Sequence, residues 1–354
     1  MNASPNKLLQ SLFSGALDIV GDVHGEYLAL RQLLRHLGYD KFGEHPGGRR
    51  LVFVGDLCDR GPDSPAVVNL VRELIGRDLA QCVLGNHEIN LLRQERKNGN
   101  GWMFDQHPDH EKPWHAACQR ANGREREDIR RFFNSLPLTL ERQDLRVTHA
   151  AWHAPSLQQL AQRPLQDTLI HYRHFEASLP QLIPRRLSEA AEREKKQWSV
   201  LLPDPNAVVP LLENLAAEDE IYQTANPIRV VTSGLEKRCE QPFYASGKWR
   251  MVGRVPWWDS YSERPVIVGH YWRWWDKGAA NLYSRGEPDL FSGAGPLDWM
   301  GDSKAVYCVD FSVGARFREI TDGHEPGRFT RLGAVRWPDN EIAFDNGERF
   351  ALRR

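Results

Sequence analysis

Three short apolar runs near the start of the chain, each followed at once by a glycine and a group of polar residues, constrain the fold more than any other feature. The runs lie at residues 16–20, 51–54 and 81–84. The intervening stretches carry apolar residues at helical spacing, over residues 27–37 and again after the prolines at residues 62 and 65. Strands that alternate with helices in this way predict a parallel sheet with right-handed crossovers. Ligands gather beyond the carboxyl ends of such strands.

Further strands are predicted along the rest of the chain. They lie at residues 145–148, 228–232, 265–268 and 305–309, and an antiparallel meander follows at residues 329–336, 341–344 and 349–352. Residues 93–128 and 156–255 are irregular and polar. We interpret them as insertions, or cap elements, within one domain that spans residues 1–354. Mixed charges at helical spacing over residues 185–197 predict a solvated helix face.

The composition excludes several classes of protein. The chain has 46 basic and 47 acidic residues, and this balance argues against a general DNA binder or a protein that binds anionic membranes, although it leaves room for a local basic patch. Five cysteines without a CxxC pair argue against a disulfide framework and a cysteine zinc site. Because no apolar run approaches the roughly 18 residues of a membrane span and no signal peptide is recognisable, we expect a soluble cytoplasmic protein.

The polar groups behind the predicted strands indicate a metal site. The sequences GDVHG (21–25), GDLCDRG (55–61) and GNHE (85–88) each begin with a glycine, which allows a tight turn at a strand end. Two histidines follow later strands. The six candidate ligands are Asp22, His24, Asp56, Asn86, His149 and His270. Any one motif alone is typical of chance or of a helix cap, but carboxylates and imidazoles massed at one sheet edge would be unstable without a cation.

The same motifs, together with THA at residues 148–150 and GH at residues 269–270, resemble the calcineurin-like metallophosphoesterases. The DRG and GNHE forms resemble the phosphoprotein-phosphatase branch, which includes bacterial Ser/Thr phosphatases and symmetrical diadenosine-tetraphosphate hydrolases. The resemblance covers residues 16–150 and 265–315. It implies an α/β core of two packed mixed β-sheets flanked by helices, with inserted cap-like loops.

The resemblance also assigns roles to the ligands. Asp22 and His24 would bind a first metal ion, Asp56 would bridge two ions, and Asn86, His149 and His270 would complete the second site. Manganese is the first expectation, with iron, zinc or magnesium as alternatives, because mixed carboxylate, amide and imidazole sites accept several ions. Two such ions can hold a bridging hydroxide and clamp a phosphoryl oxygen.

Three further side chains are expected to act on the substrate. In the family pattern His87 would protonate the leaving oxygen, Asp59 would orient His87, and Arg60 would grip the phosphate. A second phosphate-binding arginine is also expected, and we favour Arg254. The alternatives are Arg250, Arg264 and Arg273.

A cluster of tryptophans flanks His270. It comprises Trp257, Trp258, Trp272, Trp274 and Trp275. These rings could form a stacking wall for a nucleobase or an aromatic substrate group, or an aromatic core that anchors the neighbouring segment. We favour the aromatic core.

The expected function is hydrolysis of phosphomonoesters, phosphoprotein included, by metal-activated hydroxide. The alternative is a symmetrical dinucleoside-polyphosphate hydrolase. A third hypothesis, an inactive binding scaffold, is disfavoured because all six candidate ligands stand in the sequence. The expected partners are therefore a phosphorylated small molecule, a nucleotide or a phosphoprotein. The oligomeric state does not follow from the sequence.

Overall fold

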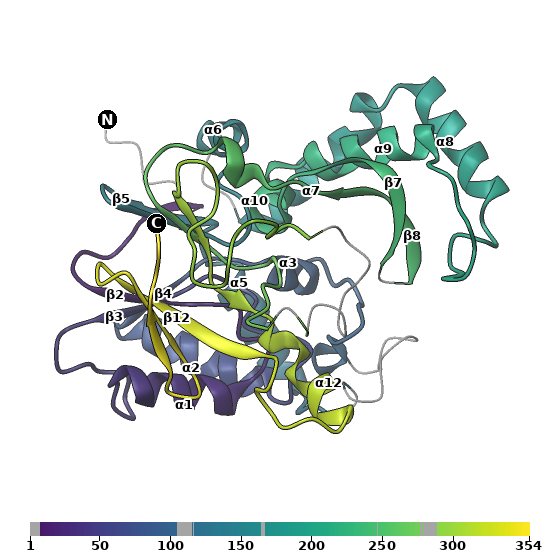
Figure 1. Cartoon of the computed structure of the whole chain (residues 1–354). Coiled ribbons are helices and arrows are strands. Elements are labelled where there is room, and N and C mark those ends of the chain that lie inside the picture. The colour runs from purple at the N-terminus through teal and green to yellow at the C-terminus, as the bar shows by residue number, and fades with distance from the viewer. Residues whose placement is uncertain are drawn as a thin grey trace.

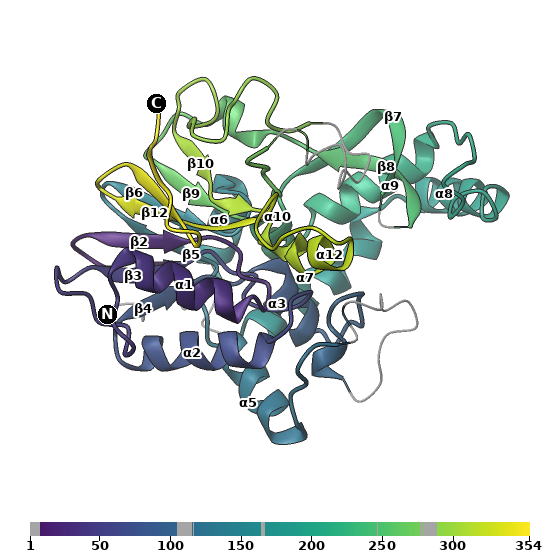
Figure 2. The same cartoon turned by 60° about the horizontal axis from the view of Figure 1, so that its bottom comes forward.

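Two β-sheets pack against each other, and helices flank them (Figures 1 and 2). The computed structural model describes residues 8–104, 115, 117–163, 167–245, 247–276, 278 and 289–354. The larger sheet has the order β14 (Arg349–Ala351), β13 (Glu341–Phe344), β12 (Arg331–Trp337), β2 (Leu17–Val20), β3 (Arg50–Phe53) and β4 (Ala80–Cys82), and β11 (Asp310–Phe311) pairs with β12. The smaller sheet has the order β1 (Leu9–Ser11), β5 (Thr139–Arg142), β6 (Leu145–Thr148), β9 (Val266–Val268) and β10 (Val306–Cys308).

The parallel unit β2–β3–β4 confirms the prediction from the first three apolar runs. Its crossovers are α1 (Tyr27–Leu37) and α2 (Ser64–Gly76), which lie together on one face of the larger sheet in Figure 1. Helix α1 ends at Gly38, which adopts the left-handed conformation. Helix α2 begins after Asp63, whose carboxylate accepts a hydrogen bond from the Ala66 amide. Because the three strands are parallel, their carboxyl ends lie at one edge of the sheet.

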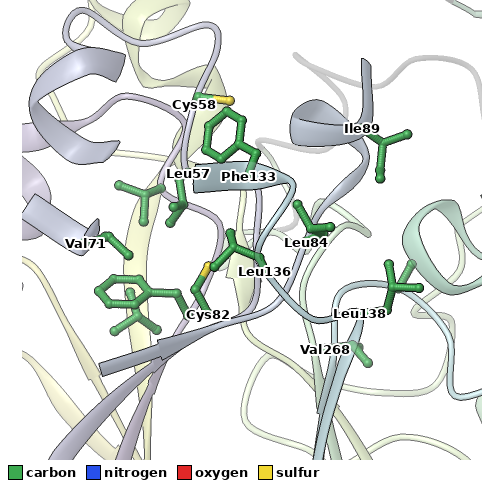
Figure 3. Packing of buried hydrophobic residues seen from close by; sticks show 14 of the residues in the cluster. Leu57, Cys58, Val71, Cys82, Leu84, Ile89, Phe133, Leu136, Leu138 and Val268 are labelled. Atoms are coloured by element: carbon green, nitrogen blue, oxygen red, sulfur yellow. The ribbon is translucent and has the colours of Figure 1, made fainter. Parts of the chain in front are cut away.

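Alternation of side chains along the strands builds two cores. Ile19 and Val52 pack in a cluster with Val147 and Ile267 of the smaller sheet, so this cluster lies between the sheets. The intervening residues belong to a second and larger cluster that includes the helices. Figure 3 shows part of it. Phe133, the last residue of helix α5 (Gly123–Phe133), is drawn there together with Leu57 and Cys58 of the second motif and with Leu84 and Ile89 on either side of the third. The polar loops therefore adjoin two packed apolar clusters.

Part of residues 156–255, which we call the cap segment, packs in the larger core, and the rest extends away from the sheets. The segment contains the end of α6 (Ala154–Ala161), then α7 (Thr168–Leu182), α8 (Arg185–Gln197), α9 (Glu213–Thr224), α10 (Pro227–Ser233) and the hairpin of β7 (Glu236–Ala245) and β8 (Lys248–Arg254). Figure 1 shows α8, α9 and the hairpin projecting to one side. They enclose a small apolar cluster of their own, which includes Leu215 and Met251. The division into one domain with two insertions stays a prediction.

The strand predicted at residues 228–232 is wrong, because these residues form α10. The Asn226 side chain accepts hydrogen bonds from the amides of Ile228 and Arg229, and Pro227 occupies the first turn. Residues 227–232 are all buried, so the run has no solvent-exposed face. A short apolar run of this kind has the same pattern in a buried strand and in a buried helix. The capping residues before it carried the signal that distinguishes the two.

A few short elements remain among the described residues. They are α3 (Asn86–Leu92), α12 (Arg316–Thr321) and the 3₁₀ turns at Gly101–Met103, Trp257–Ser260 and Val313–Ala315. Among the described helices, none is both long and apolar enough to cross a membrane.

Candidate active site

Several polar residues of the loops after the strands have uncommon backbone conformations. His24 and Asp56 have φ values of 47° and 48°, and Asp59, Arg60 and His270 have φ values of 71°, 72° and 69°. Non-glycine residues rarely adopt this left-handed region, which costs on the order of 1–3 kcal/mol for each residue. Such strain at five neighbouring positions indicates a functional site.

Two groups of potential ligands share Asp56. The side chains of His24, Asp56 and His87 form one group, and those of Asp56, His149 and His270 form the other, with ligand atoms within 4.8 Å of one another in each. The Asp56 carboxylate lies 3.7 Å from His24 Nε2 and 3.4 Å from His149 Nε2. A carboxylate common to two groups is what a bridging ligand requires.

Backbone carbonyls fix the orientation of two of the histidines. His24 Nδ1 donates to the Cys58 carbonyl at 2.9 Å, and His149 Nδ1 donates to the Val54 carbonyl at 2.8 Å. Each ring therefore presents Nε2 toward Asp56. Metal-binding histidines are commonly held by a hydrogen bond at the other ring nitrogen, which fixes the tautomer.

Asn86 and Asp22 connect the second histidine pair to the site. Asn86 Oδ1 lies 2.8 Å from His270 Nδ1 and 3.2 Å from His149 Nε2. The Asp22 carboxylate accepts a bond from the His270 amide at 3.2 Å and lies 3.8 Å from His24 Nε2. His270 Nε2 is buried and makes no hydrogen bond within the part of the chain that the structure describes. An orphaned imidazole nitrogen beside carboxylates fits a metal ligand.

The ionisation of the site also fits a bound cation. Burial, Asp310 and Asp56 raise the pKa of Asp22 well above its usual value. Burial opposes the charge of Asp56 as well, but the nearby His149 and His87 hold the pKa of Asp56 well below its usual value. Burial lowers the pKa of both His24 and His270. Burial opposes the charge of His149 too, but Asp56 raises its pKa. Imidazoles around crowded carboxylates are donors that a borderline divalent ion takes. The residues present therefore fit a metal centre.

His87, Asp59 and Arg60 adjoin this cluster. His87 Nδ1 lies 2.6 Å from Asp59 Oδ2. The Arg60 guanidinium donates to His87 Nε2 and to His24 Nε2, both at 2.9 Å, and lies 4.7 Å from the centre of the Trp272 ring. The structure thus brings all three residues to the metal ligands. Since His87 also lies in the first ligand group, its separate role as proton donor stays a prediction.

Two glycines are required by close approach to the carboxylates. A Cβ atom at Gly85 would lie 2.1 Å from Asp56 Oδ1, and one at Gly269 would lie 2.0 Å from Asp22 Oδ1. Any side chain at either position would displace a ligand. The glycines before Asn86 and His270 therefore provide space at the site.

Sequence reasoning missed the role of Glu88, whose side chain binds backbone amides of the second motif. This buried carboxylate accepts bonds from the amides of Asp56 and Leu57 at 2.9 Å and from the Gly85 amide at 2.8 Å. It thereby ties the second and third loops together. The available signal was an acid at the third position of α3, where a carboxylate caps a helix start. Asp310 was missed as well. It is buried near Asp22, and its carboxylate accepts a bond from the Trp272 amide.

A polar cavity of about 300 Å³ lies between the candidate ligands and the cap segment. Asn86 and His270 line it at one end, and Arg254 lies in its wall. The electrostatic effect of Arg254 helps to lower the pKa of His270, after burial, so the two lie close. The lining described by the structure includes none of the three alternative arginines. Its further polar residues are Asn90, Arg93, Glu95, Lys97, Tyr172, Tyr222, Gln223, Arg229, Thr232, Ser233 and Glu236.

The tryptophan cluster divides into buried and half-buried members. Trp257 and Trp258 are buried in the larger core, and Trp257 Nε1 donates to the Ala150 carbonyl at 3.1 Å. Trp275 packs against Phe311, Phe344 and Phe350. These three rings fit the predicted aromatic core. Trp272 and Trp274 are half-buried, with ring centres 6.2 Å apart, and Trp272 contacts the site residue Arg60.

Comparison with known proteins places the chain in a family. The sequence model of the calcineurin-like phosphoesterases matches residues 16–231, which contain all three motifs and His149. The chain belongs to the calcineurin-like phosphoesterase family. Membership confirms the resemblance drawn from the motifs, and the observed sheets flanked by helices confirm the expected fold. Members of this family bind divalent metal ions, in keeping with the two ligand groups around Asp56.

The curated relatives include enzymes named bis(5'-nucleosyl)-tetraphosphatase PrpE [asymmetrical]. That of Halalkalibacterium halodurans is 51% identical over 79 residues, which cover 22% of this chain and 32% of the relative. The first of these relatives are thus matched over about a third of their length. That of Bacillus velezensis is 31% identical over 194 residues, which cover 52% of this chain and 76% of the relative.

Solved structures with a similar chain trace include two phosphatases. A cold-active protein-tyrosine phosphatase of a Shewanella species has a TM-score of 0.47 and 14% identity, and the match covers 99% of this chain and 83% of that one. A protein serine/threonine phosphatase of Saccharomyces cerevisiae has a TM-score of 0.46 and 14% identity, over 96% and 80% of the two chains.

Proposed function

We propose that this phosphoesterase is a metal-dependent phosphohydrolase that cleaves phosphomonoesters, phosphoprotein included. The observation that carries the proposal is the pair of buried ligand groups that share Asp56, with Arg60 directly beside them. Asp22, His24 and Asp56 would hold one metal ion, and Asp56, Asn86, His149 and His270 would hold the other, with manganese as our first choice. When bound, these ions supply an activated water molecule as the nucleophile and neutralise charge on the phosphoryl group.

The protein's own side chains would bind and orient the phosphate. Arg60 offers a planar guanidinium that can donate two parallel hydrogen bonds to phosphate oxygens. Its present acceptors are imidazole nitrogens of His24 and His87, so it is already directed at the ligand cluster. His87, held through Nδ1 by Asp59, would give its proton to the leaving oxygen.

One substrate panel tests this proposal. p-Nitrophenyl phosphate, a phosphopeptide and diadenosine tetraphosphate are incubated with the wild-type protein under manganese, iron, zinc and magnesium in turn, and with Asp56→Asn as the control. We expect metal-dependent release of phosphate from the first two substrates by the wild type alone. If the wild type left all three substrates intact under every metal, the enzyme proposal would be rejected.

A second candidate function is hydrolysis of dinucleoside polyphosphates. It is favoured by the cavity beside His270, where Arg93, Lys97 and Arg254 could meet further phosphate groups of a longer substrate. The enzyme name of the curated relatives, bis(5'-nucleosyl)-tetraphosphatase, favours the same function. In the panel, a preference for diadenosine tetraphosphate would place this function first. Two ADP as products would indicate symmetrical cleavage, and ATP with AMP would indicate the asymmetrical cleavage named for the relatives.

A further inference from the structure

Trp102 contacts the proposed proton-donor pair from the segment predicted as the first insertion. It lies in the 3₁₀ turn Gly101–Met103, and its side chain is 1% exposed. The indole Nε1–H donates to Asp59 Oδ1 at 2.6 Å, while Asp59 Oδ2 meets His87 Nδ1 at 2.6 Å. We propose that Trp102 is a positioning residue that fixes the Asp59 carboxylate and, through it, aims His87 at the leaving oxygen. The inference rests on the proposed phosphohydrolase function.

The Asp59 carboxylate needs a second partner to hold one orientation. It is completely buried, and each of its oxygens has a different partner, the indole on one side and the imidazole on the other. A carboxylate held at both oxygens cannot turn about its bond to the rest of the side chain without breaking a bond. Hydrogen bonds to a charged acceptor are stronger than those to a neutral one, so the two bonds favour one rotamer of Asp59 and one orientation of the imidazole ring.

The Trp102 turn is itself anchored to the site. The Ala121 amide donates to the Trp102 carbonyl at 3.0 Å, and the Arg60 amide donates to the Gly99 carbonyl at 2.8 Å. The same segment therefore supports Asp59 through a side chain and Arg60 through the backbone. Segment 99–102 therefore acts as a support for both Asp59 and Arg60.

The reaction defines what such support must change. In hydrolysis an oxygen of water forms a bond to phosphorus, the ester bond between phosphorus and the leaving oxygen breaks, and a proton reaches that leaving oxygen. In the proposed function His87 gives this proton. A leaving group that departs readily as an anion has little need of it, whereas an alkoxide has great need. A misdirected His87 therefore slows poor leaving groups selectively.

The test compares leaving groups in wild type and Trp102→Phe with manganese bound. Phenylalanine keeps an aromatic ring at the site but has no N–H group. We expect kcat on p-nitrophenyl phosphate to stay within about threefold of wild type, and kcat on ethyl phosphate to fall by about tenfold or more, since general acids contribute roughly 10²–10⁴-fold. Trp102→Leu, which is apolar and also lacks a donor, provides a second variant with the same expectation. A double variant with Asp59→Asn should show no further selective loss.

Trp337→Phe is the matched control. Trp337 is also largely buried, and its Nε1–H also donates to a carboxylate, that of Asp144, at 2.8 Å. This variant should leave the ratio between the two substrates unchanged. An equal loss on both substrates for the Trp102 variants, or no loss on either, would overturn the positioning role. Hydrolysis of p-nitrophenyl phosphate by the wild type reports separately on the proposed function.

Discussion

The candidate metal loops and the cap segment are stabilised in different ways. In the loops, nearly every polar group is buried and bonded to a neighbour of fixed position, as the three amides bound to the Glu88 carboxylate show. In the cap, the helix α8 has only Ala191 fully buried, and pairs such as Arg185 with Glu189 face solvent. The loops are fixed by many short bonds, whereas α8, α9 and the hairpin of the cap enclose only a small apolar cluster of their own.

This difference suggests a division of labour between chemistry and selection. The loops supply every proposed metal ligand, together with His87, Asp59 and Arg60. Of the proposed site residues, only Arg254 comes from the cap. The cavity lies between the two regions, with α3 on one side and α9, α10 and the hairpin on the other. We infer that changes in the loops abolish turnover, while changes in the cap alter which substrate is accepted.

The largest effect is expected for Asp56→Asn. The amide has the same shape, but it cannot be a charged ligand shared by both groups. We expect kcat to fall by at least about 10³-fold and metal binding to weaken, because removing one partner leaves the other buried groups uncompensated. Isothermal titration with manganese and initial rates on p-nitrophenyl phosphate measure the two effects. Wild-type affinity for both ions would contradict the shared role of Asp56.

A smaller effect is expected for His87→Asn, which tests the chemistry of the loops without removing a proposed ligand. Turnover should fall by about 10²-fold or more because the proton donor is lost. Metal content should stay at the wild-type level. Metal analysis of the purified variant and rates on ethyl phosphate provide the measurements. Loss of one metal ion would instead make His87 a ligand, as its place in the first ligand group allows.

The site was predictable from the sequence because its residues follow strands whose ends are marked by glycine. The carboxyl ends of β2, β3 and β4 meet at one edge, so a local pattern sufficed to bring Asp22, His24, Asp56 and Asn86 together. Glu88 and Trp102 were not predictable in the same way. The partners of their side chains lie 30 or more residues away in the chain, apart from the Gly85 amide, and only the tertiary structure brings those partners together.

The cap was harder to predict than the loops. The helix at residues 185–197 was predicted with its observed bounds, because its charges recur at helical spacing on an exposed face. Residues 228–232 were assigned to a strand because burial on all sides removes any periodic signal. The position of Arg254 at the cavity depends on the pairing of β7 with β8, whose register shifts between Arg238 and Phe243. Such a non-local register leaves no mark in a single sequence.

Arg254→Gln tests whether the cap selects the substrate. The guanidinium lies in the cavity wall, and a charge-assisted hydrogen bond contributes about 1.5–3 kcal/mol. We expect kcat/KM for diadenosine tetraphosphate to fall by about tenfold, mainly through KM, with a smaller change for p-nitrophenyl phosphate. Arg250→Gln, on the same strand but outside the cavity lining, is the control. A larger loss in kcat than in KM would move Arg254 from selection to chemistry.

The smallest effect is expected for Glu194→Ala, which destabilises only the cap segment. Glu194 lies on α8, and its carboxylate accepts bonds from the Asn214 side chain at 2.7 Å and the Leu215 amide at 2.8 Å. It thereby caps the start of α9, which has no cap of its own. Removing such a cap costs about 1 kcal/mol. Faster hydrogen exchange in α9, with unchanged turnover of p-nitrophenyl phosphate, is the expected result.

Glu189→Ala is the matched control for that experiment, because its ion pair with Arg185 is exposed and such pairs contribute little. If Glu194→Ala slowed turnover of p-nitrophenyl phosphate as well, the cap would contribute to the chemistry. The loops would then depend on the cap for their geometry, and the two regions would form one cooperative unit. Unchanged turnover beside faster exchange would show that α9 can open without disturbing the ligands around Asp56.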